Sequence, residues 1–361
     1  MGKGGGNGKG RSVTAFDPAV PDLTVRGAGV TGLSIAWEAA RRGARVRVIE
    51  TARVGAGASG GLVGALAPHT PEQWTPVKEF QLQALLAAPA FWAGVEQASG
   101  LPSGYARARR WQPLADQAAV ALAETRIEAA RSLWRGHAEW RVIPRPDHPF
   151  APPSATGLLI EDTLSARLHP RLALAALVAA IRGAGGEVIE GADAPEQGPV
   201  IWATGTAGLA ALETAGDRPR GYGVKGQAAS FHCPGFESAP QVFADALHIV
   251  PHVDGSIAVG STSETSWSDP TSTDALLEAL IAKARRLLPV LADAPVLHRW
   301  AGLRPRSANR RPLLGPWPGR PGEFVANGGF TIGFGIAPQV AVTMVDLVLE
   351  GRDHIPAAFR P

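Results

Sequence analysis

The sequence contains a single cysteine, Cys233, among 361 residues. One thiol excludes an internal disulfide framework, and it also excludes zinc or iron–sulfur sites that need several cysteine ligands. We therefore expect a reducing, cytoplasmic location and no metal site.

Long hydrophobic runs are also missing. No segment reaches the roughly 18 uninterrupted apolar residues that a membrane span needs. The nearest approach is 332–345, which Pro338 and Gln339 interrupt. The N-terminal segment carries glycines and basic residues but no apolar core of a signal peptide. Residues 1–21 are accordingly predicted to be a disordered extension or to result from a misassigned start, and no membrane span is expected.

A strong charge of one sign is absent as well. The formal net charge is +3 and the basic residues are scattered, so a nucleic-acid partner is not expected. With 45% hydrophobic and 19% charged residues, the chain can bury the core of one large domain or two interleaved ones.

Residues 23–50 are predicted to form a strand, a glycine turn, a helix and a second strand. Gly27, Gly29 and Gly32 form the pattern G-x-G-x-x-G, in which the glycines permit a tight turn, close approach to a pyrophosphate and helix–strand packing. The helix N-terminus offers unpaired N–H groups to phosphates. Glu50 ends the second strand, where a carboxylate can accept hydrogen bonds from ribose hydroxyls. The sequence therefore predicts a dinucleotide site, which also includes Val30 and Thr31.

The βαβ unit by itself does not separate FAD from NAD. After Glu50 the chain enters VGAGASGGLVGALAP, a run of small residues that suits backbone held against a flat ring or a diphosphate. A flexible glycine loop is the other interpretation. Ala58, Ser59 and Gly60 are predicted to contact the cofactor here.

A strand far downstream favours a flavoprotein. Residues 199–205 read PVIWATG, a buried strand that ends in Thr204 and Gly205. Its return to the nucleotide-binding sheet implies that a second domain is inserted between strands of the sheet. Both residues are predicted at the cofactor, together with Val188 in the preceding strand EVIEG.

Several blocks in fixed order resemble the D-amino-acid oxidase family of FAD oxidoreductases, which includes glycine oxidase and sarcosine oxidase. The resemblance covers residues 22–351 and rests on GAGVTG, GASGGLVGALAP, LHPRLALAAL, WATG, GVKGQ, HIVPHVDGSIAVGST, GLRPRSANRRPLLGP and NGGFTIGFGIAP. It implies an α/β fold in which a Rossmann-like FAD-binding domain (22–85, 151–215 and 301–361) is interleaved with a substrate domain built on a mixed or antiparallel sheet (86–150 and 216–300).

The resemblance also implies the chemistry. Family enzymes transfer a hydride from the carbon beside the substrate nitrogen to flavin N5, and the resulting imine hydrolyses. Positioning does much of this catalysis while the flavin supplies the redox chemistry. The expected substrate is the primary or secondary amine of an amino acid of the glycine, sarcosine or D-amino-acid type, with O2 or an unknown acceptor. Because Cys233 is far from the GLRP block, FAD is expected to be noncovalent.

Arg304 and His248 are the candidate catalytic residues. Arg304 matches the arginine that binds the substrate carboxylate in glycine oxidase-like relatives. Its planar guanidinium can donate two parallel hydrogen bonds to a carboxylate. An arginine that ties loops together through backbone carbonyls is the alternative. His248 stands where related oxidases often place a tyrosine, and could donate a hydrogen bond, titrate near neutral pH or be structural. His69 is a weaker candidate for facing the flavin.

The last glycine block precedes a predicted helix over residues 339–349. In relatives this loop wraps the flavin ring, and the resemblance assigns Gly333, Phe334, Gly335 and Ile336 to it. The helix N-terminus would stabilise negative charge that develops on the flavin. Thr331 replaces a second substrate-facing arginine of many relatives. This departure and that of His248 keep a noncatalytic FAD-binding assembly factor open as an alternative. A tRNA-modifying flavoenzyme of the same fold also stays open, because the family that the sequence resembles includes one.

Overall fold

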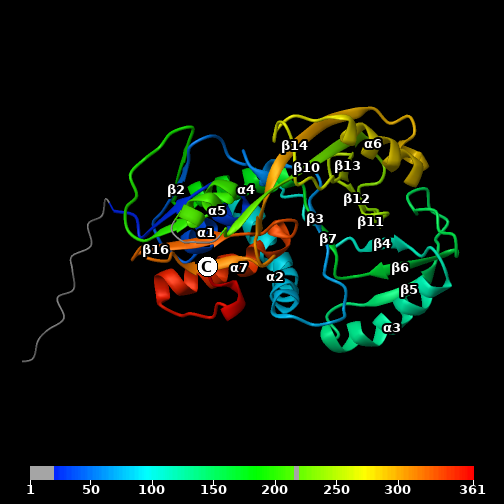
Figure 1. Ribbon diagram of the computed structural model, residues 1–361, viewed down its shortest axis with the longest axis horizontal. Coiled ribbons are helices and arrows are strands. Elements are labelled where there is room, and N and C mark those ends of the chain that lie inside the picture. Colours follow the sequence, from blue (N-terminus) through cyan, green and yellow to red (C-terminus); the bar gives the residue numbers. More distant parts are fainter. Residues whose placement is uncertain (1–19, 215–218) are drawn as a thin grey trace, which may run out of the picture.

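The computed structural model describes residues 20–214 and 219–361. Most of the predicted N-terminal extension, residues 1–19, lies outside this part of the chain. The described residues build two large sheets that lie side by side (Figure 1).

The first sheet carries the nucleotide-binding motif. Its six strands are parallel to their neighbours, except in the antiparallel pair β15–β16. Such strands are covered on both faces, and β1 is buried along its whole length. In spatial order the strands are β15 (Leu313–Pro316), β16 (Glu323–Asn327), β9 (Val200–Trp202), β1 (Leu23–Arg26), β2 (Val46–Glu50) and β8 (Glu187–Glu190).

Four helices pack together beside this sheet and contribute to its core: α1 (Val30–Arg41), α2 (Pro76–Ser99), α4 (Pro170–Gly183) and α7 (Gly333–Glu350). Local signals set the ends of α2. Thr75 caps its N-terminus, Pro76 occupies the first turn, and Gly100 ends the helix with φ 68°. A fifth helix, α5 (Gly205–Thr214), packs against β16 and against two strands of the second sheet.

The second sheet is mixed, because β11 and β4 are parallel while all other neighbours are antiparallel. In order, its eight strands are β14 (Val296–Ser307), β10 (Gly221–His232), β13 (Ser256–Gly260), β12 (Leu247–Pro251), β11 (Gln241–Ala244), β4 (Arg110–Pro113), β6 (Leu158–Asp162) and β5 (Trp140–Pro144). Helix α6 (Ala275–Leu287) covers β10 and β13, and α3 (Gln117–Leu133) packs on β5. The remaining short elements are β3 (Ala65–Leu66), β7 (Ala166–Arg167) and the 3-10 helices η1 (Ala58–Gly60), η2 (Pro289–Leu291) and η3 (Ala357–Phe359).

The predicted α/β fold with interleaved sheets is confirmed, since the chain leaves the first sheet after β2, returns with β8, leaves again with β10 and returns with β15. The sheets do not divide where the sequence boundaries were placed. The predicted 151–215 segment of the FAD domain includes β6, which pairs with β4 and β5 of the second sheet. The boundary at 300 cuts β14, and the boundary at 85 cuts the continuous helix α2.

The predicted start of the last helix was wrong. Helix α7 begins at Gly333 rather than at Gln339 and runs through Pro338. Proline lacks an N–H, so at this position it removes one early hydrogen bond of the helix. Among the described helices, α7 alone has the length and mean hydropathy of a membrane span, but more than half of it is buried in contact with α1 and α2.

Candidate active site

Two adjoining cavities lie where the two sheets meet. The first has a volume of about 360 Å³ and is lined by the ends of β1, β2 and β9 together with residues of β14 and β16. The second, of about 370 Å³, lies against the second sheet. Both are lined by Val30, Ala58, Ser59, Phe330 and Gly333. A ligand can therefore extend from one cavity into the other.

The glycine turn after β1 forms one wall of the first cavity. Gly27 has φ 101°, and a Cβ at this position would lie 2.6 Å from the carbonyl oxygen of Ala203. A Cβ at Gly32 would lie 2.0 Å from the carbonyl oxygen of Gly27, so its absence lets α1 pack on the turn. Gly32 itself lines neither cavity.

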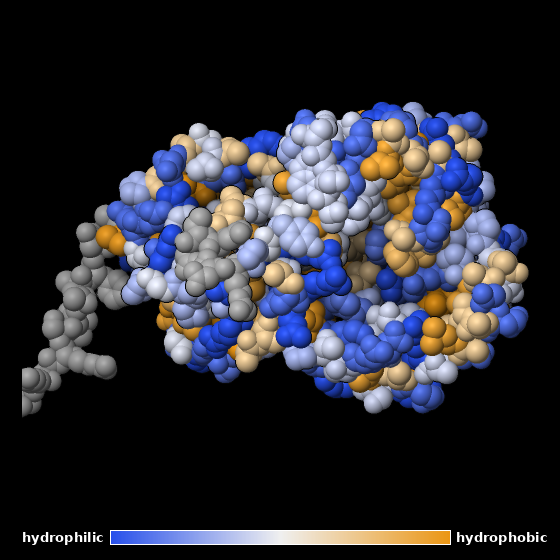
Figure 2. Space-filling view, in the orientation of Figure 1, coloured by the Kyte–Doolittle hydropathy of each residue, from blue (hydrophilic) through white to orange (hydrophobic). Residues whose placement is uncertain are grey.

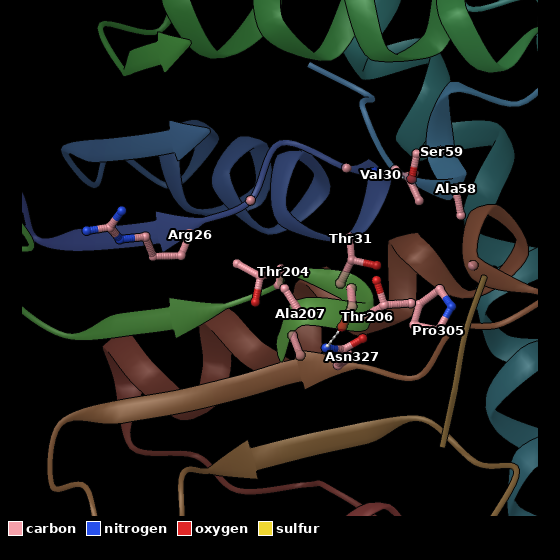
Figure 3. Close-up of a pocket in the computed structure, with 18 of the residues that line it drawn as sticks. Arg26, Val30, Thr31, Ala58, Ser59, Thr204, Thr206, Ala207, Pro305 and Asn327 are labelled. Atoms are coloured by element: carbon pink, nitrogen blue, oxygen red, sulfur yellow. Dashed lines mark hydrogen bonds between the residues drawn. The ribbon is translucent and has the colours of Figure 1, made fainter. Parts of the chain in front are cut away.

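The N-terminus of α1 opens toward the first cavity without a side-chain cap. Gly29 is its N-cap residue, and the Oγ of Ser59 accepts a hydrogen bond from the Val30 N–H at 3.0 Å. Figure 3 shows the side chains of Thr31, from α1, and Thr206, from α5, projecting toward the same space. Unpaired N–H groups and the helix dipole favour an anion such as a phosphate here.

Glu50 lies at the carboxyl end of β2 and lines the first cavity. Its Oε2 accepts a hydrogen bond from Ala28 N at 2.9 Å and its Oε1 accepts one from Ala52 N at 3.0 Å. A carboxylate has about four acceptor sites, so capacity for hydroxyl donors is left. These features, with the glycine turn and the uncapped helix, fit a dinucleotide.

The structure brings together most, but not all, of the residues predicted at the cofactor. Those that line at least one cavity are Gly27, Gly29, Val30, Thr31, Glu50, Ala58, Ser59, Thr204, Gly205, Gly333 and Phe334. Those that line neither are Gly32, Gly60, Val188, Gly335 and Ile336.

Packing explains these exceptions. A Cβ at Gly60 would lie 2.2 Å from the carbonyl oxygen of Gly55, so this glycine serves the loop itself. Val188 is buried in β8 beside β2. Gly335 and Ile336 belong to the buried side of α7 because that helix starts six residues earlier than predicted.

One row of residues across five strands forms a wall of the second cavity. The register pairs Phe243 with His248, His248 with Gly260, Gly260 with Ala228, and Ala228 with Trp300. Directly paired residues point to the same face of a sheet. The small residues Gly260 and Ala228 therefore leave a shallow floor between aromatic rings on either side, and all five residues line the cavity.

Arg304 lies on the same face of β14 as Trp300, because side chains alternate along a strand. Its Nη1 donates to Ser261 Oγ at 2.5 Å, and its Nη2 donates to the carbonyl oxygens of Thr262 at 2.6 Å and Lys225 at 3.4 Å. Its buried Nε has no partner among the described residues. Arg304 thus lines the second cavity and also ties a loop to β10, which combines both predicted alternatives.

His248 is partly buried and lines the second cavity. Burial, with a smaller contribution from the positive charge of Arg110, lowers the pKa of His248 to about 3. The imidazole is therefore neutral at physiological pH, which argues against the predicted option of titration near neutrality. A neutral ring can still offer one donor and one acceptor nitrogen.

Other residues at the site were missed or misplaced. His69 lines neither cavity; its Nδ1 lies 2.5 Å from Gln81 Oε1. Trp300 and Asn327 line the cavities but were not predicted. The spacing of Trp300 and Arg304 within one strand was a usable signal, because it places both on one face. Asn327 donates to Gly205 O at 2.8 Å, a contact between distant segments that no local pattern indicates.

Comparisons with known proteins agree with this geometry. A model of the family of FAD-dependent oxidoreductases matches residues 22–347. Glycine oxidase of Geobacillus kaustophilus is 27% identical over 360 residues, which cover 91% of this chain and 92% of that enzyme. Glycine oxidase of Pseudomonas aeruginosa is 39% identical over 140 residues, but this match spans only 38% of either chain.

Solved structures share the fold. The crystal structure of the Geobacillus kaustophilus glycine oxidase aligns with a TM-score of 0.81 at 23% identity, covering 94% of this chain and 98% of that one. An iminodiacetate oxidase from Chelativorans sp. aligns with a TM-score of 0.81 at 21% identity, with coverages of 94% and 98%. Since the family model covers most of the sequence, the chain belongs to the family of FAD-dependent oxidoreductases, and its cofactor is FAD.

Proposed function

We propose that this protein oxidises the amine of a small amino acid or N-substituted amino acid of the glycine, sarcosine or D-amino-acid type. The observation that carries the proposal is that Arg304 lines a small cavity next to the expected FAD site and that its Nε has no hydrogen-bond partner within residues 20–214 and 219–361. Bound FAD would accept the hydride from the carbon beside the nitrogen, and the released imine would hydrolyse in water.

In this proposal, Arg304 binds the substrate carboxylate. The Nε and Nη2 atoms lie on one edge of the guanidinium, and the long 3.4 Å bond from Nη2 to Lys225 O is easily exchanged. That edge can then take two parallel hydrogen bonds to a carboxylate. Ser261 Oγ continues to accept from Nη1, and Thr262 O accepts from the second hydrogen of Nη2.

The row on the second sheet would orient the rest of the substrate. Gly260 and Ala228 leave room for a small molecule, and Trp300 and Phe243 exclude water from its sides. His248 would act as a hydrogen-bond partner of the amine or carboxylate rather than as a base, because a group with a pKa of about 3 holds a proton poorly at neutral pH. The proposed cofactor contacts are those of Gly27, Gly29 and Glu50, with FAD bound noncovalently in a cytoplasmic enzyme.

The test is anaerobic titration of the purified, flavin-loaded protein with glycine, sarcosine, proline and D-amino acids, followed by flavin absorbance. We expect one class to bleach the flavin bands. Arg304→Met should raise the half-saturating concentration roughly 10- to 100-fold, the effect of losing a hydrogen-bonded charge. Arg299→Met is the matched control, since Arg299 lies on β14 but pairs with Glu278 at the surface.

Two outcomes would contradict the proposal. Flavin bands that persist with every amine would favour a noncatalytic FAD-binding protein. If Arg304→Met and the parent protein are bleached with the same half-saturating substrate concentration, Arg304 does not bind the substrate.

A further inference from the structure

A buried lysine lies behind the candidate site. Lys225, in β10, is only 2% exposed, and a lysine is rarely buried unless its charge is paired. Its Nζ lies 3.2 Å from Asp274 Oδ2 and 3.8 Å from Glu264 Oε2. The roles proposed above for the site residues do not use this ammonium group.

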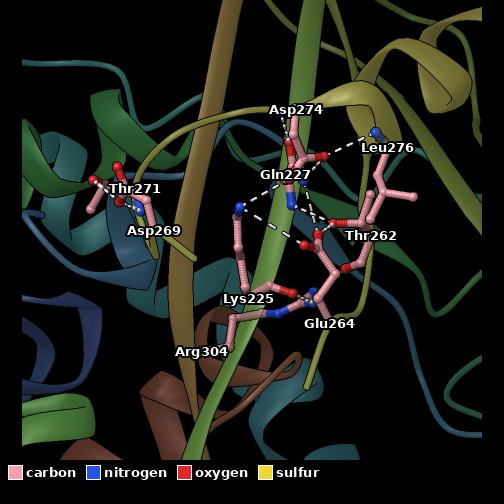
Figure 4. Close-up of polar contacts among 9 residues, drawn as sticks. All are labelled: Lys225, Gln227, Thr262, Glu264, Asp269, Thr271, Asp274, Leu276 and Arg304. Carbon is pink, nitrogen blue, oxygen red and sulfur yellow. Dashed lines mark hydrogen bonds and ion pairs between the residues drawn. The ribbon is translucent and has the colours of Figure 1, made fainter. Parts of the chain in front are cut away.

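Gln227 connects the two carboxylates. Its Nε2 donates to Asp274 Oδ1 at 2.8 Å and to Glu264 Oε1 at 3.0 Å, and its Oε1 accepts from Asp274 N at 3.0 Å. Figure 4 shows these side chains converging, and we call Lys225, Gln227, Glu264 and Asp274 the Lys225 cluster. One cation and one amide thus hold together two acidic groups that would otherwise repel.

The Lys225 cluster fixes the segment that follows β13, residues 261–264. Lys225 and Glu264 exchange both backbone hydrogen bonds at 2.9 Å. Thr262 N donates to Gln227 O at 3.1 Å, and Gln227 N donates to Thr262 Oγ1 at 2.8 Å. The segment is therefore held to β10 by these hydrogen bonds and, through the side chain of Glu264, by Gln227 and Lys225.

The same segment holds Arg304. Ser261 Oγ and Thr262 O accept the two short hydrogen bonds of the guanidinium, at 2.5 and 2.6 Å. The group lies flat on β10, where a Cβ at Gly226 would come within 2.7 Å of Arg304 Cζ. A shift of residues 261–264 would therefore turn the guanidinium relative to the second cavity.

We propose that the Lys225 cluster positions Arg304 through residues 261–264 and thereby determines how tightly the site binds a carboxylate. This inference rests on the proposed function, in which Arg304 binds the substrate carboxylate. Without the charge of Lys225, Glu264 and Asp274 repel each other, and Glu264 also attracts the nearby guanidinium more strongly. Both effects draw Arg304 away from its working orientation.

The experiment uses the flavin-loaded protein and three variants. Lys225→Met removes the cation. Asp274→Asn removes the carboxylate nearer to Lys225 Nζ, at a half-exposed position, so the ammonium is drawn toward Glu264 and shifts the segment that carries it. The remaining oxygen of residue 274 can still accept from Leu276 N to cap α6. Asp269→Asn is the matched control, because Asp269 makes the same kind of bond, to Thr271 N, in the same loop but contacts no member of the cluster.

The dissociation constant of acetate, a carboxylate without an amine, is measured from its effect on flavin absorbance. Anaerobic bleaching by the best amino acid then separates affinity from the rate at saturation. We expect Lys225→Met and Asp274→Asn to weaken acetate binding about tenfold or more, the usual effect of losing a well-placed hydrogen bond to a charged group. The saturating rate should change much less, and Asp269→Asn should match the parent.

The inference would be overturned if folded, flavin-loaded Asp274→Asn and Lys225→Met bind acetate as tightly as the parent does. If Lys225→Met does not fold, the result for Asp274→Asn decides. An equal loss of rate and affinity would also overturn it, because that pattern indicates general damage. Arg304→Met separates the two proposals. If it binds acetate normally, the proposed role of Arg304 fails; if it alone is impaired, only the positioning role fails.

Discussion

At the scale of single residues, the surroundings of a side chain decide what it can do. His248 and His252 both lie in or beside β12, and burial is the main cause that lowers the pKa of each, to about 3 and about 4. In the unfolded chain the same rings titrate near their ordinary pKa of 6.5. Folding therefore removes two groups that would otherwise be protonated in mild acid.

His248 should make the protein sensitive to acid. Between pH 6.5 and 3 the unfolded state binds a proton that the folded state does not, so stability is lost as the pH falls through this window. The contribution is at most about 1.4 kcal/mol per pH unit. We expect His248→Gln to show a smaller drop in melting temperature from pH 7 to pH 5 than the parent.

The remaining slope should come partly from His252, so the drop is reduced rather than abolished. His354→Gln, at an exposed position, is the control and should behave as the parent does. An identical pH slope in His248→Gln and the parent would show that folding does not lower the pKa of His248.

At the scale of elements, close packing of α1 on β1 sets the shape of the nucleotide turn. This packing depends on Gly32, which faces the carbonyl of Gly27. Gly94 offers a contrast, because it lies inside α2 with nothing within 4 Å of an added Cβ. The two glycines therefore predict opposite results for the same substitution.

Gly32→Ala should destabilise the protein by about 1–3 kcal/mol, the usual effect of overpacking, and should weaken FAD binding because the turn must move. Gly94→Ala should stabilise it by about 0.5–1 kcal/mol through helix propensity. Urea unfolding and FAD titration measure both effects. Normal stability and FAD affinity in Gly32→Ala would contradict the packing described here.

At the scale of the whole molecule, the two sheets share the walls of the cavities. The first cavity is lined by Val30 and Glu50 from the first sheet and its helices, and by Leu303 and Pro305 from β14 of the second. Figure 2 shows a mostly polar face with a hollow where the two halves meet. Bound FAD would therefore hold both halves together.

Added FAD should raise the melting temperature of flavin-stripped protein in a concentration-dependent way. A ligand at 100 times its dissociation constant stabilises the folded state by about 2.7 kcal/mol. NAD at the same concentrations is the control and should have little effect. A melting temperature that does not change when FAD is added would contradict the presence of a preformed FAD site.

The sequence by itself determined the dinucleotide turn, the interleaved fold and the use of FAD. These depend on local chemistry, such as the φ of Gly27 and the spacing to Glu50, and on the order of several motifs. Only the tertiary structure decided which residues meet at the cavities. It placed Val188 and Ile336 outside the cavity walls, placed Trp300 and Asn327 in them, and set the start of α7.

The physical reason is that cavity walls are built by strand register and helix packing between segments far apart in the chain. The row from Phe243 to Trp300 depends on four strand pairings, and Arg304 donates hydrogen bonds to the carbonyl oxygens of Lys225 and Thr262, which are distant in sequence. The low pKa of His248 comes from burial that its neighbours in sequence do not specify. The order of several motifs therefore determined the cofactor, whereas long-range packing decided which residues line the second cavity.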